Sequence, residues 1–124
     1  MNLLLDTSAF LYWSQANPRV PSGWVETIVD PANNVFVSAV SAWEVAIKRK
    51  LGKLVFEGST LEAATFHGFS WIDITPREAE HAGALDWAHR DPFDRLLVAQ
   101  AAERRLVLVT SDSAMMAAPG IRTL

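Results

Sequence analysis

Short apolar runs alternate along the chain with longer segments in which apolar residues recur every three or four positions. The short runs predict β-strands at residues 2–5, 35–37, 71–74, 106–109 and 121–123, the last of them an edge strand. The intervening segments predict helices at residues 8–16, 23–30, 40–50, 59–67, 76–88, 92–104 and 112–117. Strands that alternate with helices are typical of an α/β fold with a mostly parallel sheet. In a chain of 124 residues, we therefore expect one domain, residues 1–124, with a central sheet of four to five strands flanked by helices.

Four acidic residues, far apart in the sequence, lie at the ends of these predicted elements. Asp6 directly follows the first strand, and Asp112 comes shortly after the fourth. Glu44 and Asp94 lie near the starts of two helices. Because the carboxyl ends of parallel strands share one edge of a sheet, we expect these side chains to converge there. Carboxylates in one pocket repel each other unless a divalent cation lies between them, and such metal clusters cleave phosphodiesters.

Each strand-end acid also has a plain structural explanation. Asp6 can cap the helix that starts near Ser8, and Asp112 can cap the short helix that follows it. Near Asp112, the Thr110 hydroxyl can join the cap or hydrogen-bond a metal-bound water. The sequence alone leaves both roles open.

Glu44 admits two registers of its helix. Ser41 and Glu44 fit a capping box, in which the Glu reaches back to the first amide of the helix. Similar boxes are Ser59 to Glu62 and Thr75 to Glu78. If the helix instead begins near Ser38, Glu44 lies within it and faces the pocket. The second register places Trp43 on an apolar stripe that faces the core.

That stripe is formed by residues at spacings of three and four, namely Val40, Trp43, Ile47 and Leu51. Lys48 lies one turn after Glu44, at the rim of the expected pocket. It belongs to a basic helix end that favours solvent exposure, and it is also placed to contact a phosphate.

Residues 89–95 form the densest polar stretch of the chain. Asp91 is a good N-cap because Pro92 occupies the favoured first helical position. Asp94 falls in the first turn, where the helix dipole stabilises a carboxylate by only about 0.3–1 kcal/mol. Arg95 can pair with these acids or hold a phosphate through two hydrogen bonds.

Composition narrows the class of protein further. The formal charge of −3 argues against a protein that coats nucleic acid, but not against an enzyme whose acids bind metal. The absence of cysteine excludes disulfides and thiolate zinc sites and suits a reducing cytoplasm. The chain shows neither a signal-peptide pattern nor an apolar run long enough to span a membrane, so we expect a cytoplasmic protein without membrane contact.

In this order the motifs resemble a known family, the PIN domains, and within it the VapC toxins of bacterial toxin–antitoxin pairs. The segments that carry the resemblance are residues 3–8, 37–48, 51–54, 89–101 and 109–112. Among them, Trp-Glu-Val-Ala-Ile-Lys at 43–48 and Asp-Pro-Phe-Asp-Arg at 91–95 are the most specific. The resemblance implies a PIN-like three-layer fold, endoribonuclease activity, Mg²⁺ or Mn²⁺ as cofactor, a VapB-like antitoxin as partner, and a homodimer.

The resemblance also assigns the site residues. The catalytic acids of the family fall on Asp6, Glu44, Asp94 and Asp112, and Asp6, Asp94 and Asp112 would bind the metal. Asp91 competes for the third position, but residues 94–101 match the family's Asp-then-apolar helix without a gap. Residues that would contact the RNA are Thr110, Arg95 and Lys48.

Two other classes of protein remain to be separated from a nuclease. A phosphoaspartyl enzyme with Asp6 as nucleophile would expect a second Asp two residues later, where this chain has Ser8. A binding module, whose acids only cap helices, would have no tight site for a divalent ion.

Overall fold

Five strands form a single sheet in the computed structural model, which describes all residues from 1 to 124. The strands are β1 (Asn2–Leu5), β2 (Asn34–Ser38), β3 (Ser70–Ile72), β4 (Val107–Val109) and β5 (Arg122–Thr123). Their order is β3-β2-β1-β4-β5, and every neighbouring pair is parallel. The predicted α/β class and parallel sheet are therefore confirmed, and all five carboxyl ends lie at one edge.

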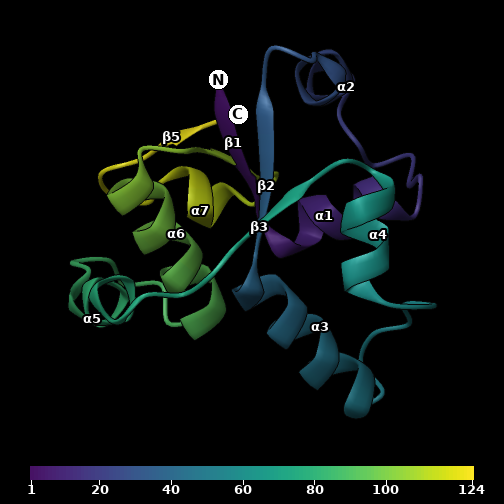
Figure 1. Cartoon of the computed structure of the whole chain (residues 1–124). Coiled ribbons are helices and arrows are strands. Elements are labelled where there is room, and N and C mark those ends of the chain that lie inside the picture. Colours follow the sequence, from purple (N-terminus) through teal and green to yellow (C-terminus); the bar gives the residue numbers. More distant parts are fainter.

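Seven helices surround the sheet. They are α1 (Thr7–Ser14), α2 (Ser22–Val29), α3 (Ala39–Lys50), α4 (Thr60–Phe66), α5 (Pro76–Ala84), α6 (Pro92–Arg104) and α7 (Ser113–Met116). Helices α1, α2 and α4 lie on one side of the sheet and α5, α6 and α7 on the other, while α3 extends beyond the end of β2 (Figure 1). The result is the expected three-layer arrangement. None of the seven helices combines the length and the apolar character that a membrane-spanning segment requires.

The central strand β1 shows why the strands read as continuous apolar runs. Leu3 and Leu5 point into one hydrophobic cluster, with Phe10 of α1. Leu4 points the opposite way, into a second cluster with Leu97 of α6. Because a parallel sheet covered by helices is buried on both faces, the three buried positions of β1 are all leucine. Burial of each such leucine stabilises the fold by roughly 1.5–3 kcal/mol.

Helix α3 begins at Ala39, and the Ser38 hydroxyl caps it by accepting a hydrogen bond from the Val40 amide at 3.0 Å. The second register is therefore confirmed, with Glu44 inside the helix. The predicted apolar stripe is wrong, because Trp43 is 55% exposed and Leu51 is also exposed. The buried side of α3 is formed by other residues, of which Val40 and Val45 join the two hydrophobic clusters. Trp43 packs only edge-on against the Phe93 ring, with centroids 5.0 Å apart.

Helix α5 is shorter than predicted. It ends at Ala84, and residues 85–88 leave the helix in extended or irregular conformation. Thr75 and Glu78 close the predicted capping box at its start, through reciprocal bonds of 2.9 and 3.1 Å. Ser59 caps α4 by accepting from the Leu61 amide. The segment after α5 is held by the side chain of Arg95, which follows it closely in the sequence.

Candidate active site

The four predicted acids line one cavity at the carboxyl edge of the sheet. The cavity has a volume of about 210 Å³. Its lining consists of Asp6, Thr7, Ser8, Glu44, Lys48, Asp91, Asp94, Asp112 and Met115. The acids come from the end of β1, from α3, from the start of α6 and from the start of α7. A cavity with this many carboxylates and a single basic group is strongly negative.

The capping role and the cavity role of the strand-end acids coexist. The Asp6 Oδ1 atom accepts a hydrogen bond from the Ala9 amide at 2.7 Å, and Asp112 Oδ1 accepts from the Ala114 amide at 2.9 Å. Both carboxylates therefore cap their helices, as the structural explanation predicts. Each cap hydrogen bond uses only Oδ1 and fixes the orientation of the carboxylate. The cap does not use Oδ2.

At the start of α6, Asp91 is the cap and Asp94 is the next acid along. Asp91 Oδ1 accepts from the amides of Phe93 and Asp94, at 2.9 and 3.1 Å. Asp94 Oδ2 lies 2.7 Å from Nε2 of His89. The His89 ring in turn stacks on Trp87, with centroids 4.6 Å apart. His89 thus orients Asp94.

Glu44 is also buried, with 4% of its surface exposed. Its Oε2 atom accepts a hydrogen bond from Nζ of Lys48 at 2.5 Å. This hydrogen bond raises the pKa of Lys48 against the opposing effect of partial burial. The other oxygen, Oε1, is buried and has no hydrogen-bond partner. An unsatisfied buried carboxylate oxygen costs stability. A cation bound at this place would give the Oε1 atom a partner.

Burial and the charges of neighbouring acids raise the pKa of two of the carboxylates, Asp6 and Asp94. Burial raises the pKa of Asp6 to about 6; the charges of Asp94 and Asp112 add to this effect, while hydrogen bonds from Thr110 and the Ala9 amide oppose it. Burial also raises the pKa of Asp94, and the His89 hydrogen bond partly offsets it. Raised carboxylate pKa values in a cleft are typical of functional sites.

The structure corrects the role predicted for Arg95. Its guanidinium donates to backbone carbonyls at the end of α5 and in the segment between α5 and α6, at 2.7 to 3.5 Å. These are the carbonyls of Ala82, Gly83, Leu85, Trp87 and His89. With its donors directed at these carbonyls, Arg95 is not available to hold a phosphate. It instead stabilises the loop that carries His89, which replaces the last turn predicted for α5.

Thr110 also differs from the prediction of an RNA contact. Only 1% of its surface is exposed. Its hydroxyl accepts a hydrogen bond from the Asp112 amide at 3.0 Å and lowers the pKa of Asp6. Thr110 therefore positions two acids from behind the cavity. Lys48, the third predicted RNA contact, does line the cavity.

Two buried hydrogen bonds behind the cavity were not predicted. The hydroxyls of Thr7 and Ser41 lie 2.9 Å apart and join the start of α1 to α3. The Ser38 hydroxyl donates to Oε1 of Gln100 on α6 at 2.5 Å. Gln100 is fully buried in an otherwise apolar stretch of α6. A polar residue in such a stretch is a sequence signal that could have been used.

Gln100 belongs to a wider buried network. Its Nε2 atom donates to the Asp73 carbonyl at 3.0 Å and to Glu78 at 3.2 Å. Glu78 also accepts from Nε of Arg104 at 2.7 Å. Burial opposes the ionisation of Glu78, but hydrogen bonds from Arg104, the Thr75 amide and Gln100 outweigh it and lower its pKa to about 2. This network fixes α5 and α6 relative to the sheet edge.

The acids fit a divalent cation chemically, although they do not form a ready-made cage. No group of three or more acidic or histidine side chains is gathered closely enough to hold an ion in the arrangement described. Each carboxylate has an oxygen engaged by another donor, such as Lys48 or His89. The donor set is nevertheless all oxygen, which suits Mg²⁺ or Mn²⁺, and the Glu44 Oε1 atom lacks a partner.

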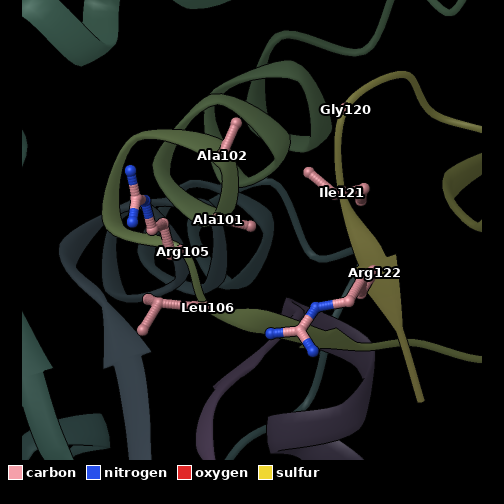
Figure 2. Close-up of a pocket in the computed structure, with 7 residues that line it drawn as sticks. All are labelled: Ala101, Ala102, Arg105, Leu106, Gly120, Ile121 and Arg122. Atoms are coloured by element: carbon pink, nitrogen blue, oxygen red, sulfur yellow. The ribbon is translucent and has the colours of Figure 1, made fainter.

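A second cavity lies near the opposite edge of the sheet and has different chemistry. Its volume is about 390 Å³, and it lies between the end of α6 and β5 (Figure 2). Arg105 and Arg122 flank an apolar floor formed by residues such as Leu106 and Ile121. It contains no acid, histidine or hydroxyl group. This second cavity therefore offers no side-chain ligand for a divalent cation, unlike the acidic cavity.

Comparison with known sequences decides the family. The sequence model of the PIN domain matches residues 3–120. The chain belongs to the PIN domain family. No curated protein matches this sequence closely enough to count as a relative.

Solved structures share this PIN fold over nearly their whole length. One chain of VapBC2 from Rickettsia felis, bound to a promoter DNA fragment, has a TM-score of 0.74 at 16% identity, with 100% of this chain and 98% of that chain covered. DNA-bound VapBC from Salmonella typhimurium has a TM-score of 0.72 at 19% identity, with 100% of this chain and 97% of that chain covered. A toxin–antitoxin complex from Klebsiella pneumoniae gives 0.63 at 22% identity, with 96% and 94% covered. At these identities the likeness establishes the fold.

Proposed function

We propose that this PIN domain is a metal-dependent endoribonuclease, the VapC-type toxin of a toxin–antitoxin pair. The observation that carries the proposal is the convergence of Asp6, Glu44, Asp94 and Asp112 on one cavity. The buried Oε1 atom of Glu44, which has no partner, supports a cation at this place. Family membership supports nuclease chemistry.

In this proposal Asp6, Asp94 and Asp112 hold Mg²⁺, for which Mn²⁺ can substitute. When bound, the metal supplies a water of lowered pKa and stabilises the charge that develops on the phosphoryl oxygens. Glu44 completes the ligand set or orients the attacking water. The helix caps at Asp6 and Asp112 hold these carboxylates in fixed directions, so little ordering is needed when the ion binds.

Lys48 is the side chain best placed to contact a phosphate of the RNA. It lies at the cavity, and its side chain is 42% exposed. An ammonium group contacts phosphate as a point charge and needs no fixed geometry. Thr110 and Arg95 act behind this surface, through Asp6 and through the loop that holds His89.

The proposed partner is a VapB-like antitoxin, since the three structural neighbours named above are toxin–antitoxin complexes. Helix α4 exposes Leu61 and Phe66, which border a cavity of about 420 Å³. Exposed apolar surface of this kind favours a protein partner. Co-expression with the product of the adjacent open reading frame, followed by gel filtration, tests the pairing. Recovery of the two chains in separate peaks at micromolar concentration would refute it.

We further propose that the protein works in the cytoplasm as a homodimer, as the family resemblance implies. The lack of cysteine suits the reducing conditions there. Light scattering of the purified chain at several concentrations measures the oligomeric state. A mass of 13.7 kDa at all concentrations would mean a monomer and would refute the dimer.

The activity is tested by comparing the parent with Asp6→Asn. Each protein is incubated with total bacterial RNA in Mg²⁺, in Mn²⁺ and in EDTA, and the new 5′ ends are sequenced. We expect the parent to cut at defined positions with either metal and not in EDTA, and the variant to cut at none. Asp86→Asn makes the same change of charge at an exposed site outside the cavity and should cut normally. Equal cleavage by parent and Asp6→Asn would refute the proposed site.

A further inference from the structure

The acidic cavity already contains one cation of the chain's own. Lys48 is the single basic residue among those that line it. Its Nζ atom lies 2.5 Å from Oε2 of Glu44. The side chain of Glu44 is 6% exposed and that of Lys48 is 42% exposed. The pair therefore joins an anchored carboxylate to an ammonium group that can leave for solvent.

The positive charge of Lys48 reduces the repulsion among the acids of the metal-free cavity. Glu44, Asp91 and Asp94 all lie close enough to attract its charge. Without a cation, buried like charges of this kind repel each other and destabilise the fold. An ammonium on a flexible four-carbon stem is suited to a temporary role, because it is strongly hydrated and can be released at little cost.

We propose that Lys48 is the counter-ion of the metal-free pocket, and that a divalent ion binds by displacing its ammonium group from Glu44. This inference rests on the function proposed above. One oxygen of Glu44 is bonded to Lys48 and the other has no partner. A divalent ion on the free oxygen would lie beside the ammonium group and repel it, so the two cations exclude each other.

Displacement also links metal loading to the substrate. While Lys48 is paired with Glu44, its charge is neutralised within the cavity. Once released, the same ammonium group stands at the rim beside the metal site, where it can contact a phosphate of the RNA. The metal-loaded protein should therefore bind RNA through Lys48, and the metal-free protein should not.

Lys48→Met tests the displacement, because methionine keeps most of the side-chain volume and removes the charge. The full-length variant and parent are titrated with Mn²⁺ at pH 7.5, by calorimetry and by thermal unfolding. We expect the variant to bind Mn²⁺ about tenfold more tightly, a typical size for coupling between two binding events. In EDTA it should melt below the parent, because Glu44 is then buried without a partner. At saturating Mn²⁺ the two melting temperatures should coincide.

Lys50→Met is the matched control. Lys50 is exposed on the same helix, makes no ion pair, and its loss changes the net charge equally. If Lys48→Met binds Mn²⁺ no more tightly than Lys50→Met, while the parent binds Mn²⁺ and cleaves RNA, the displacement is refuted and the nuclease stands. Weaker binding by Lys48→Met also refutes it, since Lys48 would then support the metal site. If no protein in the series binds Mn²⁺, the displacement and the proposed function fail together.

Discussion

Asp6→Asn separates the charge of this side chain from its structural role. Asparagine has nearly the same size as aspartate and is an equally good N-cap. Its carbonyl oxygen can accept the hydrogen bond that Oδ1 receives from the Ala9 amide at 2.7 Å. The substitution therefore removes a negative charge from the cavity and keeps the start of α1 intact.

The size of the stability change in Asp6→Asn follows from the pKa of Asp6, which is raised from 3.8 to about 6. A raised pKa means that ionisation is harder in the folded chain than in the unfolded one. Folding therefore loses stability as the pH rises from 3.8 through about 6, and the full loss is present at pH 7.5. Roughly two pKa units at 1.36 kcal/mol each give about 3 kcal/mol as an upper limit. Burial of the asparagine amide has its own cost, so we expect a gain of about 1–3 kcal/mol.

The assay is thermal unfolding in EDTA between pH 5 and 8. The parent should lose stability as the pH rises through about 6, and Asp6→Asn should show a flatter profile. At pH 7.5 the variant should melt several degrees higher, since about 1 kcal/mol corresponds to roughly 3–5 °C in a domain of this size. Asp86→Asn, in an exposed position, should leave the melting temperature within about a degree of the parent, because surface substitutions rarely exceed 0.5 kcal/mol.

Two outcomes would refute this reasoning. One is a variant that melts at or below the parent at pH 7.5 in EDTA, which would mean that Asp6 stabilises the free protein. The other is an unchanged pH profile in the variant, which would place the titration on a different group. A variant that is more stable and also inactive on RNA would support a site kept for function at the expense of stability.

Three further substitutions probe the scaffold around the cavity. Arg95→Lys cannot reproduce the planar fork that binds several carbonyls, so urea unfolding should show a loss of about 2–4 kcal/mol; a loss below 0.5 kcal/mol would contradict this. Glu78→Gln should flatten the acid limb of the stability curve, because the parent loses up to about 3 kcal/mol as the pH falls from 4.5 to about 2; parallel curves by circular dichroism would argue against it. Gln100→Leu leaves Ser38 and Glu78 without one partner each and should cost about 2–4 kcal/mol; its stability is measured in urea, and a neutral result would show that the network is dispensable.

The strands could be predicted because their signal is local. Residues 3–5 and 107–109 are buried on both faces, so each segment appears in the sequence as an unbroken apolar run. The convergence of Asp6 and Asp112 then follows from parallel pairing alone. These two acids needed no tertiary detail to be placed.

The errors came from interactions between distant segments. The end of α5 could not be predicted from residues 76–88, because Arg95 supplies the donors that satisfy the carbonyls of the extended segment. The exposure of Trp43 follows from α3 extending past the sheet, which periodicity cannot show. The pairing of Glu44 with Lys48 could be predicted from their helical spacing. The burial of Glu44 could not, because it depends on how the elements that line the cavity meet.

The place of β1 in the middle of the sheet has a consequence for synthesis on the ribosome. Its two neighbours are β2, which follows soon after, and β4, at residues 107–109. Most of the chain must therefore emerge before the first strand gains its second partner and before Asp112 joins the other acids. A nascent chain consequently lacks a complete cavity for almost the whole of its translation. The proposed ribonuclease would therefore be inactive while most of its chain is being synthesised.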